Sequence, residues 1–350
     1  MVCFQVLKPH NRAKLDKCSP FIFLCSLGFD SFQCAMTVSA ISYSIFYLLL
    51  SLLAQSLCVF GVDTTNVVND IDAPLKYTPN ITLATVAGSI FAATVVGLLI
   101  WSIWYRGYYM VTIITGAIGY ALGLFLRIRY TQEPTNPAVY NAMDLFLLLS
   151  PSGFIAGVFM MLVPIATYLD AQEFLILKPN ILTKIFLVAE FTAFLVQGAG
   201  SAMSIALDTE TKGLGSKILL SGLILQTVSL TAYMNIFGLF VFRLWKARKD
   251  EWRNRPNGIL KHWLALLMVV GVGLQNLSIR GGYRMLVTMQ GPDGPLSSSE
   301  QFFYTAECVT LWGAISAFLT VWPPRYLAMP RPIIAKDVEV QSVASFYSRL

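Results

Sequence analysis

Long apolar segments separated by short polar ones make up most of the chain between residues 82 and 322. The hydrocarbon core of a bilayer is about 30 Å thick, and a helix needs about 20 apolar residues to cross it. Seven segments are close to this length or exceed it, and they predict an all-α, polytopic membrane protein with a bundle of seven transmembrane helices. The predicted spans are Thr82–Tyr105, Tyr109–Leu126, Met143–Leu169, Ile181–Leu207, Ile218–Trp245, Leu260–Ile279 and Phe302–Trp322.

An eighth apolar segment, Val38–Phe60, precedes these spans and follows a basic region. Two interpretations stay open for it: an additional helix, or a signal segment that is cleaved or that follows an alternative start at Met36. The predicted organisation is an N-terminal basic region with a signal-anchor or signal-like segment at residues 1–60, a short exoplasmic segment at 61–81, the seven-helix membrane domain at 82–326, and a cytoplasmic tail at 327–350.

Composition agrees with a membrane protein. The chain is 56% hydrophobic and 13% charged, whereas a soluble domain has about 25% charged residues. Its net charge of +6 comes mainly from short loops and the N-terminus, which indicates membrane orientation rather than nucleic-acid binding. We therefore expect an integral membrane protein whose partners are membrane lipids or amphiphilic small molecules, with no nucleic acid.

The loop Arg243–Lys261 predicts the orientation, because it holds seven basic residues against two acids. By the positive-inside rule this loop is cytoplasmic. The segment Gly61–Ile81 is then exoplasmic and the C-terminus cytoplasmic. Asn80 begins an Asn-Ile-Thr sequon on the predicted outer side and is a candidate glycosylation site. The predicted location is the plasma membrane, with an endomembrane as the alternative.

The sequence contains no motif for a metal, a cofactor or ATP. Five of the six cysteines lie within the first 58 residues, and His10 and His262 are the only histidines, which disfavours an intramembrane zinc hydrolase. No Walker-type phosphate loop occurs. We expect no catalytic residues, no metal ligands and no cofactor, and therefore a protein that is not an enzyme.

Polar side chains inside the apolar segments are the candidates for function, because ionisable residues in a span are costly. Glu190 and Gln197 are seven residues apart and share a helix face, and Gln226 lies in the next span. The small residues 198–202 predict close helix contact. Glu190 and Glu307 are the candidates for proton coupling.

Arg280 and Arg284 are one turn apart at the predicted outer end of the sixth span, and Glu300, Tyr304 and Glu307 share a face in the seventh. Two interpretations remain open. The arginines and acids form ion pairs that fix helix packing, or they form a polar cleft toward the outer leaflet that holds the head of an amphiphile.

Two other basic residues have simpler interpretations. Arg127, near the outer end of the second span, and Lys184, near a cytosolic helix end, are predicted to be interfacial anchors.

Four segments together carry a resemblance to a known family: KPNILTKIFLVAEFTAFLVQGAGSAM, GSKILLSGLILQTVSL, IRGGYRMLVTMQG and SEQFFYTAE. Over residues 77–326 the chain resembles the fungal lipid-translocating exporters, also called the RTA-like family. The resemblance implies a seven-helix protein with an outer N-terminus, linked to the movement of sphingoid bases or other amphiphiles and to resistance against toxic lipids. The family's polar positions fall on Glu190, Gln197, Gln226, Arg280, Tyr283, Arg284, Glu300, Tyr304 and Glu307.

The chain departs from the family pattern at several of its charged positions. Gly116 and Gly123 stand where the family has an acid and an arginine around Gly-Tyr in the second span. Pro164 and Val287 stand at two more of its charged positions. The departures imply a divergent member that has lost several buried charges, in which transport activity or substrate can differ.

These observations favour a membrane transporter or exporter, or a resistance factor, that moves sphingoid-base-like or sterol-like amphiphiles without an ATPase of its own. The alternative is a seven-helix sensor or receptor for lipids or stress, because the helix count and the outer N-terminus also fit that architecture.

Overall fold

The computed structural model describes residues 75, 77, 79–105, 107–134, 136–204, 209–249, 263–291, 294, 296–297, 299–327. Its longer helices are α3 (Ile81–Tyr105), α4 (Val111–Gln132), α5 (Pro137–Tyr168), α6 (Pro179–Ser204), α7 (Thr209–Ala247) and α9 (Trp263–Gln290). The last span consists of α10 (Glu300–Phe302), the π-helix η4 (Phe303–Val309), α11 (Thr310–Thr320) and α12 (Pro323–Leu327). Two short 3-10 helices, η1 (Tyr108–Met110) and η2 (Gln172–Phe174), lie in connections.

Seven helical segments in the described part of the chain are long and apolar enough to cross a membrane. They confirm the predicted all-α, seven-span architecture, and the protein is a multi-pass membrane protein. The eighth predicted segment, Val38–Phe60, lies outside the described residues, as does most of the predicted exoplasmic segment at 61–81 and nearly all of the tail at 327–350.

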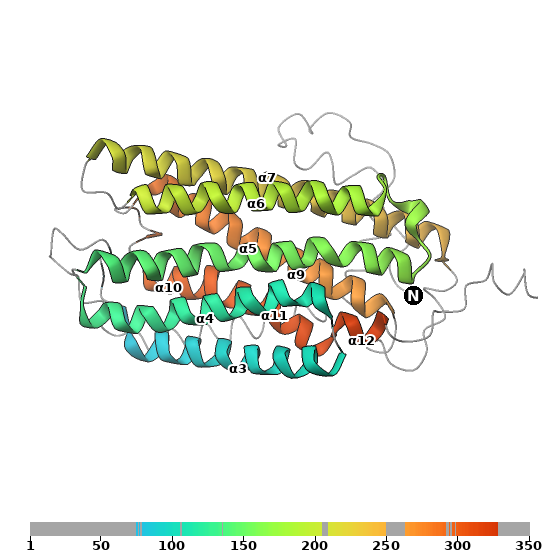
Figure 1. Cartoon of the computed structure of the whole chain (residues 1–350), viewed down its shortest axis with the longest axis horizontal. Coiled ribbons are helices and arrows are strands. Elements are labelled where there is room, and N and C mark those ends of the chain that lie inside the picture. Colours follow the sequence, from blue (N-terminus) through green and yellow to red (C-terminus); the bar gives the residue numbers. More distant parts are fainter. Residues whose placement is uncertain are drawn as a thin grey trace, which may run out of the picture. The chain divides into compact units, whose positions relative to one another are not determined.

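The spans pack in sequence order and close on themselves (Figure 1). Each long helix from α3 to α9 contacts the next along the chain, α9 contacts α11, and α11 contacts α3. Helix α5 also contacts α9 and α7, so α5 supplies much of the interior, including the buried aromatic side chains of Phe154 and Phe159. We call the end at which α3 begins the Asn80 end, and the opposite end, at which α4 begins, the Tyr109 end.

Four helix boundaries differ most from the prediction. Helix α4 ends at Gln132 instead of Leu126, α5 begins at Pro137 instead of Met143, α7 begins at Thr209 instead of Ile218, and α9 continues to Gln290 instead of ending at Ile279. Hydropathy places a helix end where polar residues begin. In α9 the polar residues after Ile279 are satisfied by side chains of other helices, as described below, so the helix continues.

The close helix contact predicted at residues 198–202 is confirmed, and the structure shows α7 as the partner helix at two glycines. A Cβ on Gly200 would lie 2.3 Å from the backbone nitrogen of Leu219, and a Cβ on Gly222 would lie 3.0 Å from the backbone nitrogen of Gln197. The absence of side chains at these positions lets the two backbones approach, as small residues do in membrane helix pairs.

The π-helix η4 is an irregular part of the last span. It covers Phe303–Val309 and contains both Tyr304 and Glu307. A π-turn widens the helix by an additional residue per turn relative to an α-helix, and such turns are frequent at functional sites. It also changes which residues share a face, because the spacing between Glu300 and Glu307 no longer equals two α-helical turns.

Candidate functional site

Buried and partly buried polar side chains gather in three clusters between the middle of the bundle and the Asn80 end. The Arg127 cluster contains Tyr77, Arg127 and Glu300. The central ion cluster contains Asp144, Arg280, Arg284 and Glu307. The glutamine cluster contains Ser152, Glu190, Gln197 and Gln226.

The Arg127 cluster joins the end of α4 to the start of the last span. Arg127 Nη2 donates to the Tyr77 hydroxyl at 2.6 Å and lies 3.5 Å from Glu300 Oε1. Its guanidinium also lies 4.2 Å from the centroid of the Phe303 ring. Burial raises the pKa of the Tyr77 hydroxyl, so this hydroxyl remains neutral while it accepts the bond. Arg127 is 2% exposed. The interpretation as an interfacial anchor is therefore wrong, since paired acid and aromatic groups hold this cation inside the protein.

Asn80 links this cluster to the start of α3. Its backbone N–H donates to Glu300 Oε1 at 2.9 Å, and its side-chain oxygen accepts from the N–H groups of Thr82 and Leu83. Asn80 therefore caps the helix. Its glycosylation remains a prediction.

The central ion cluster pairs two arginines of α9 with two acids from other elements. Arg280 Nη2 lies 3.1 Å from Glu307 Oε1, and Arg284 Nη1 lies 3.5 Å from Glu307 Oε2. Arg284 Nη2 also lies 2.7 Å from Asp144 Oδ1 of α5, whose other oxygen accepts from the Ser201 hydroxyl of α6. Four segments of the bundle therefore meet at this cluster.

A proline in α5 creates one of the contacts of Arg280. Arg280 Nη2 donates to the backbone oxygen of Leu147 at 3.0 Å. In a regular helix this oxygen would accept from the N–H of residue 151, but Pro151 has no N–H. The proline thus leaves the backbone oxygen of Leu147 without its helical donor, and Arg280 donates a hydrogen bond to it instead.

The glutamine cluster holds an acid without a cationic partner. Gln226 Nε2 donates to Glu190 Oε1 at 2.6 Å and to the Ser152 hydroxyl at 3.0 Å, and Gln197 Nε2 donates to Gln226 Oε1 at 3.2 Å. Glu190 is 2% exposed and forms no ion pair with any described residue. Its Oε2 and the Oε1 of Gln197 are buried and have no hydrogen-bond partner among the described residues.

The structure brings together most of the predicted polar residues but divides them differently. Glu300 pairs with Arg127, not with Arg280 or Arg284, because the π-helix turns Glu300 and Glu307 toward different arginines. Tyr304 lies against Arg127, 5.7 Å from its guanidinium to the ring centroid, and its hydroxyl has no partner in the described part of the chain. Tyr283 is partly exposed and joins none of the three clusters by a hydrogen bond.

The sequence interpretation missed three members of these clusters, Tyr77, Asp144 and Ser152, and it missed Ser201, which donates to Asp144. Asp144 carried a usable signal, since it is an acid at the second position of the predicted span Met143–Leu169. The two serines carried none, because hydroxyl groups are common in membrane helices and usually bond to their own backbone. Arg127 also shows that α4 retains a buried charge, although Gly116 and Gly123 carry none.

The clusters are closed in this conformation. Arg127, Glu190, Arg280, Glu300 and Glu307 are all at most 4% exposed. Only the Arg284–Asp144 pair reaches the surface in part, with side chains 14% and 22% exposed. The predicted polar cleft therefore appears as a sealed network with one partly exposed pair at its edge. In the described residues no group of histidine, cysteine or acidic side chains is arranged to hold a metal ion.

The chain matches the family described as RTA1 like protein over residues 111–330. It belongs to this family. The matched region contains all of α4 to α12 and thus every member of the clusters except Tyr77. No solved structure matches the chain.

The relatives come from Saccharomyces cerevisiae. The chain is 24% identical to Protein RTA1 over 213 residues, which is 60% of this chain and 64% of the relative. It is 22% identical to Protein RTM1 over 206 residues, or 58% and 64%. It is 24% identical to Protoporphyrin uptake protein 1 over 207 residues, or 58% and 65%. The chain thus spans slightly less than two thirds of the length of each relative.

Proposed function

We propose that the protein moves an amphiphile with a cationic head, such as a sphingoid base, across the plasma membrane, and that the central ion cluster and the glutamine cluster contact this head. The family supports a transporter-like role. The similarity to a protein named for protoporphyrin uptake supports the transfer of an amphiphilic small molecule. The chain supplies no ATP-binding motif, so a gradient or a partner would drive net movement.

The observation that carries the proposal is the charge balance of the buried clusters. They contain four acids, Asp144, Glu190, Glu300 and Glu307, and three arginines, Arg127, Arg280 and Arg284. If all are ionised, the interior has one negative charge in excess. An unpaired charge in a membrane interior is costly, so Glu190 must hold a proton or find a cation. An ammonium group bound at Glu190 would cancel the excess negative charge.

The partly exposed pair suggests where the head enters. Arg284 and Asp144 lie at the edge of the network, and both connect inward, Arg284 to Glu307 and Asp144 to Ser201. An ammonium head that approaches Asp144 would compete with Arg284 and displace it. The predicted orientation places this pair toward the exoplasmic side, with the C-terminus in the cytosol.

The test compares Glu190→Gln with Glu133→Gln in cells that express the protein. Glu133 follows α4 directly, has a side chain that is 41% exposed, and contacts Arg129 and the side-chain amide of Asn136, so its substitution is a matched control outside the clusters. We expect both variants to reach the membrane at normal levels, because glutamine at position 190 still accepts from Gln226. Only Glu190→Gln should slow the efflux of a labelled sphingoid base.

The same assay separates transport from sensing. Efflux is measured with transcription blocked and at equal protein abundance. Equal efflux from wild type and Glu190→Gln would remove Glu190 from the proposed site. Tolerance that depends on transcription, with no change in efflux rate, would indicate the sensor alternative instead of transport.

A further inference from the structure

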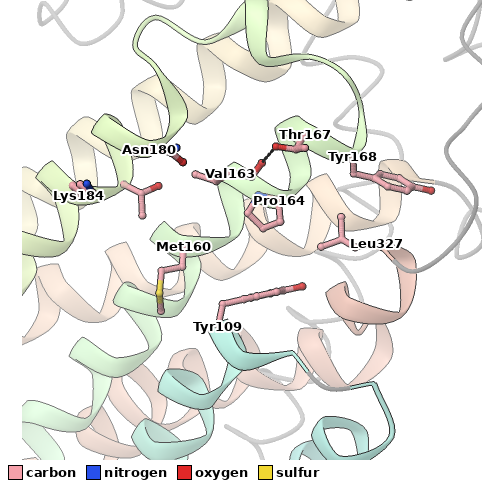
Figure 2. Close-up of a pocket in the computed structure, with 10 residues that line it drawn as sticks. Tyr109, Met160, Val163, Pro164, Thr167, Tyr168, Asn180, Lys184 and Leu327 are labelled. Carbon is pink, nitrogen blue, oxygen red and sulfur yellow. Dashed lines mark hydrogen bonds between the residues drawn. The ribbon is translucent and has the colours of Figure 1, made fainter. Parts of the chain in front are cut away.

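A pocket of about 780 Å³ lies at the Tyr109 end of the bundle, opposite the end occupied by the buried clusters. Figure 2 shows its lining side chains. They come from η1, the last turns of α5, the first turns of α6, and α12. Ligand pockets are commonly 300–1,000 Å³ in volume. The pocket therefore has room for the head and first methylenes of a lipid, but not for its full acyl chains.

One wall of the pocket is apolar. Met160, Val163 and Pro164 of α5 face Leu327 of α12 and the ring of Tyr109 (Figure 2). Pro164 has no N–H, so the backbone oxygen of Met160 lacks its regular helical donor. This is the same arrangement that Pro151 creates for Arg280. The hydroxyl of Tyr109 is buried and has no hydrogen-bond partner among the described residues.

The other wall is polar and positive. Asn180, Thr183 and Lys184 line it from the first two turns of α6, and no acid is among the lining residues. Lys184 is exposed and forms no ion pair with any described residue. The amino end of a helix carries a partial positive charge, which favours an anion there. The Lys184 ammonium and the amino end of α6 therefore both favour the binding of an anion.

We propose that this pocket binds the head of an anionic phospholipid, with its phosphate near Lys184 and Asn180 and its glycerol region against the apolar wall of α5. The lipid's chains would continue along the outer surface of the bundle. A free inorganic anion would use the positive wall but not the apolar one, so the combination favours a lipid. The predicted orientation places the Tyr109 end at the cytoplasmic leaflet, where anionic lipids are enriched. The site is independent of the transport proposal.

The first test measures phosphatidylserine and phosphatidylcholine binding to the purified full-length protein by native mass spectrometry. The variants are Lys184→Gln and, as a matched control, Lys178→Gln, an exposed lysine just before α6 that does not line the pocket. A lysine near an anionic lipid contributes about 1 kcal/mol. We therefore expect Lys184→Gln to weaken phosphatidylserine binding roughly fivefold, with little change for phosphatidylcholine or for Lys178→Gln. Equal losses in both variants would refute the site.

The second test fills the pocket without changing charge. Val163→Phe adds a ring to the apolar wall and leaves Lys184 in place. We expect it to weaken phosphatidylserine binding at least as much as Lys184→Gln does, while the protein elutes normally from size exclusion. Unchanged binding to Val163→Phe would show that the lipid meets only the surface lysine. Displacement of the lipid by millimolar inorganic phosphate would show a site for free anions, and both results would overturn the proposal.

Discussion

The buried pair of Arg127 and Glu300 provides a quantitative test of the network. Both side chains are at most 4% exposed. Among the described residues, Arg127→Gln leaves the Glu300 carboxylate with the N–H of Asn80 as its one remaining hydrogen-bond donor. Removal of one member of a buried ion pair lowers the free energy of unfolding by about 3–5 kcal/mol, because the other charge stays buried without a partner. Glu300→Gln should cost less, because the guanidinium keeps the Tyr77 hydroxyl and the face of Phe303, a cation–π contact of about 2 kcal/mol when desolvated.

The double variant Arg127→Gln with Glu300→Gln leaves no lone charge. We expect its stability to return to within about 1 kcal/mol of wild type, which corresponds to a coupling energy of about 3 kcal/mol between the two side chains. The measurement is reversible unfolding of the purified protein in mixed micelles as denaturing detergent is added. A coupling of 3 kcal/mol changes the unfolding equilibrium by about 100-fold.

A surface pair on the same helix supplies the control. Arg129 Nη2 lies 2.6 Å from Glu133 Oε1, but the two side chains are 58% and 41% exposed. Their double-mutant cycle should give a coupling of about 0.3–0.5 kcal/mol. If the Arg127–Glu300 cycle gave a similarly small value, with additive single losses, the inference that burial makes this pair strong would be refuted. The double variant should also retain efflux, because the Arg127 cluster is outside the proposed head-group site.

Two further predictions concern packing and topology. Gly200→Ala should reduce stability and abundance, because a Cβ there would lie 2.3 Å from the backbone of α7, whereas Gly213→Ala has open space and should be tolerated; thermal unfolding in detergent compares them, and equal stability of the two would contradict the close contact. A cysteine at Asn257 should resist an impermeant thiol reagent in intact cells while one at Lys212 reacts, and the reverse pattern would invert the predicted orientation.

The fold could be predicted from the sequence because membrane spans depend on length and apolarity, which are local properties. Helix ends were less predictable. In the sequence, Arg280 and Arg284 indicate that α9 leaves the membrane near residue 279. In the structure, acids of α5 and η4 form ion pairs with both arginines inside the bundle. Whether a polar residue ends a helix or continues it depends on partners in other helices, here 23 to 140 residues away along the chain, which a local pattern does not contain.

Residue types at the candidate site could be predicted, but their pairing could not. Glu190, Gln197 and Gln226 meet as expected from adjacent helices that share a small-residue interface. Glu300 was expected to face Arg280 or Arg284 because α-helical spacing puts it on one face with Glu307. The sequence shows no sign of the π-helix between them, since that irregularity follows from tertiary contacts, and α-helical spacing therefore gives the wrong pairing.

The π-helix of the last span has a consequence for how this family can change. A π-turn is equivalent to one residue inserted into an α-helix, and each residue of an α-helix turns the chain by about 100°. Deletion of one residue of this π-helix before Glu307, within residues 303–306, would therefore rotate Glu300 away from Arg127 while Glu307 stayed with α9. One codon lost between these two acids is enough to separate Glu300 from its arginine, without any substitution at a charged position.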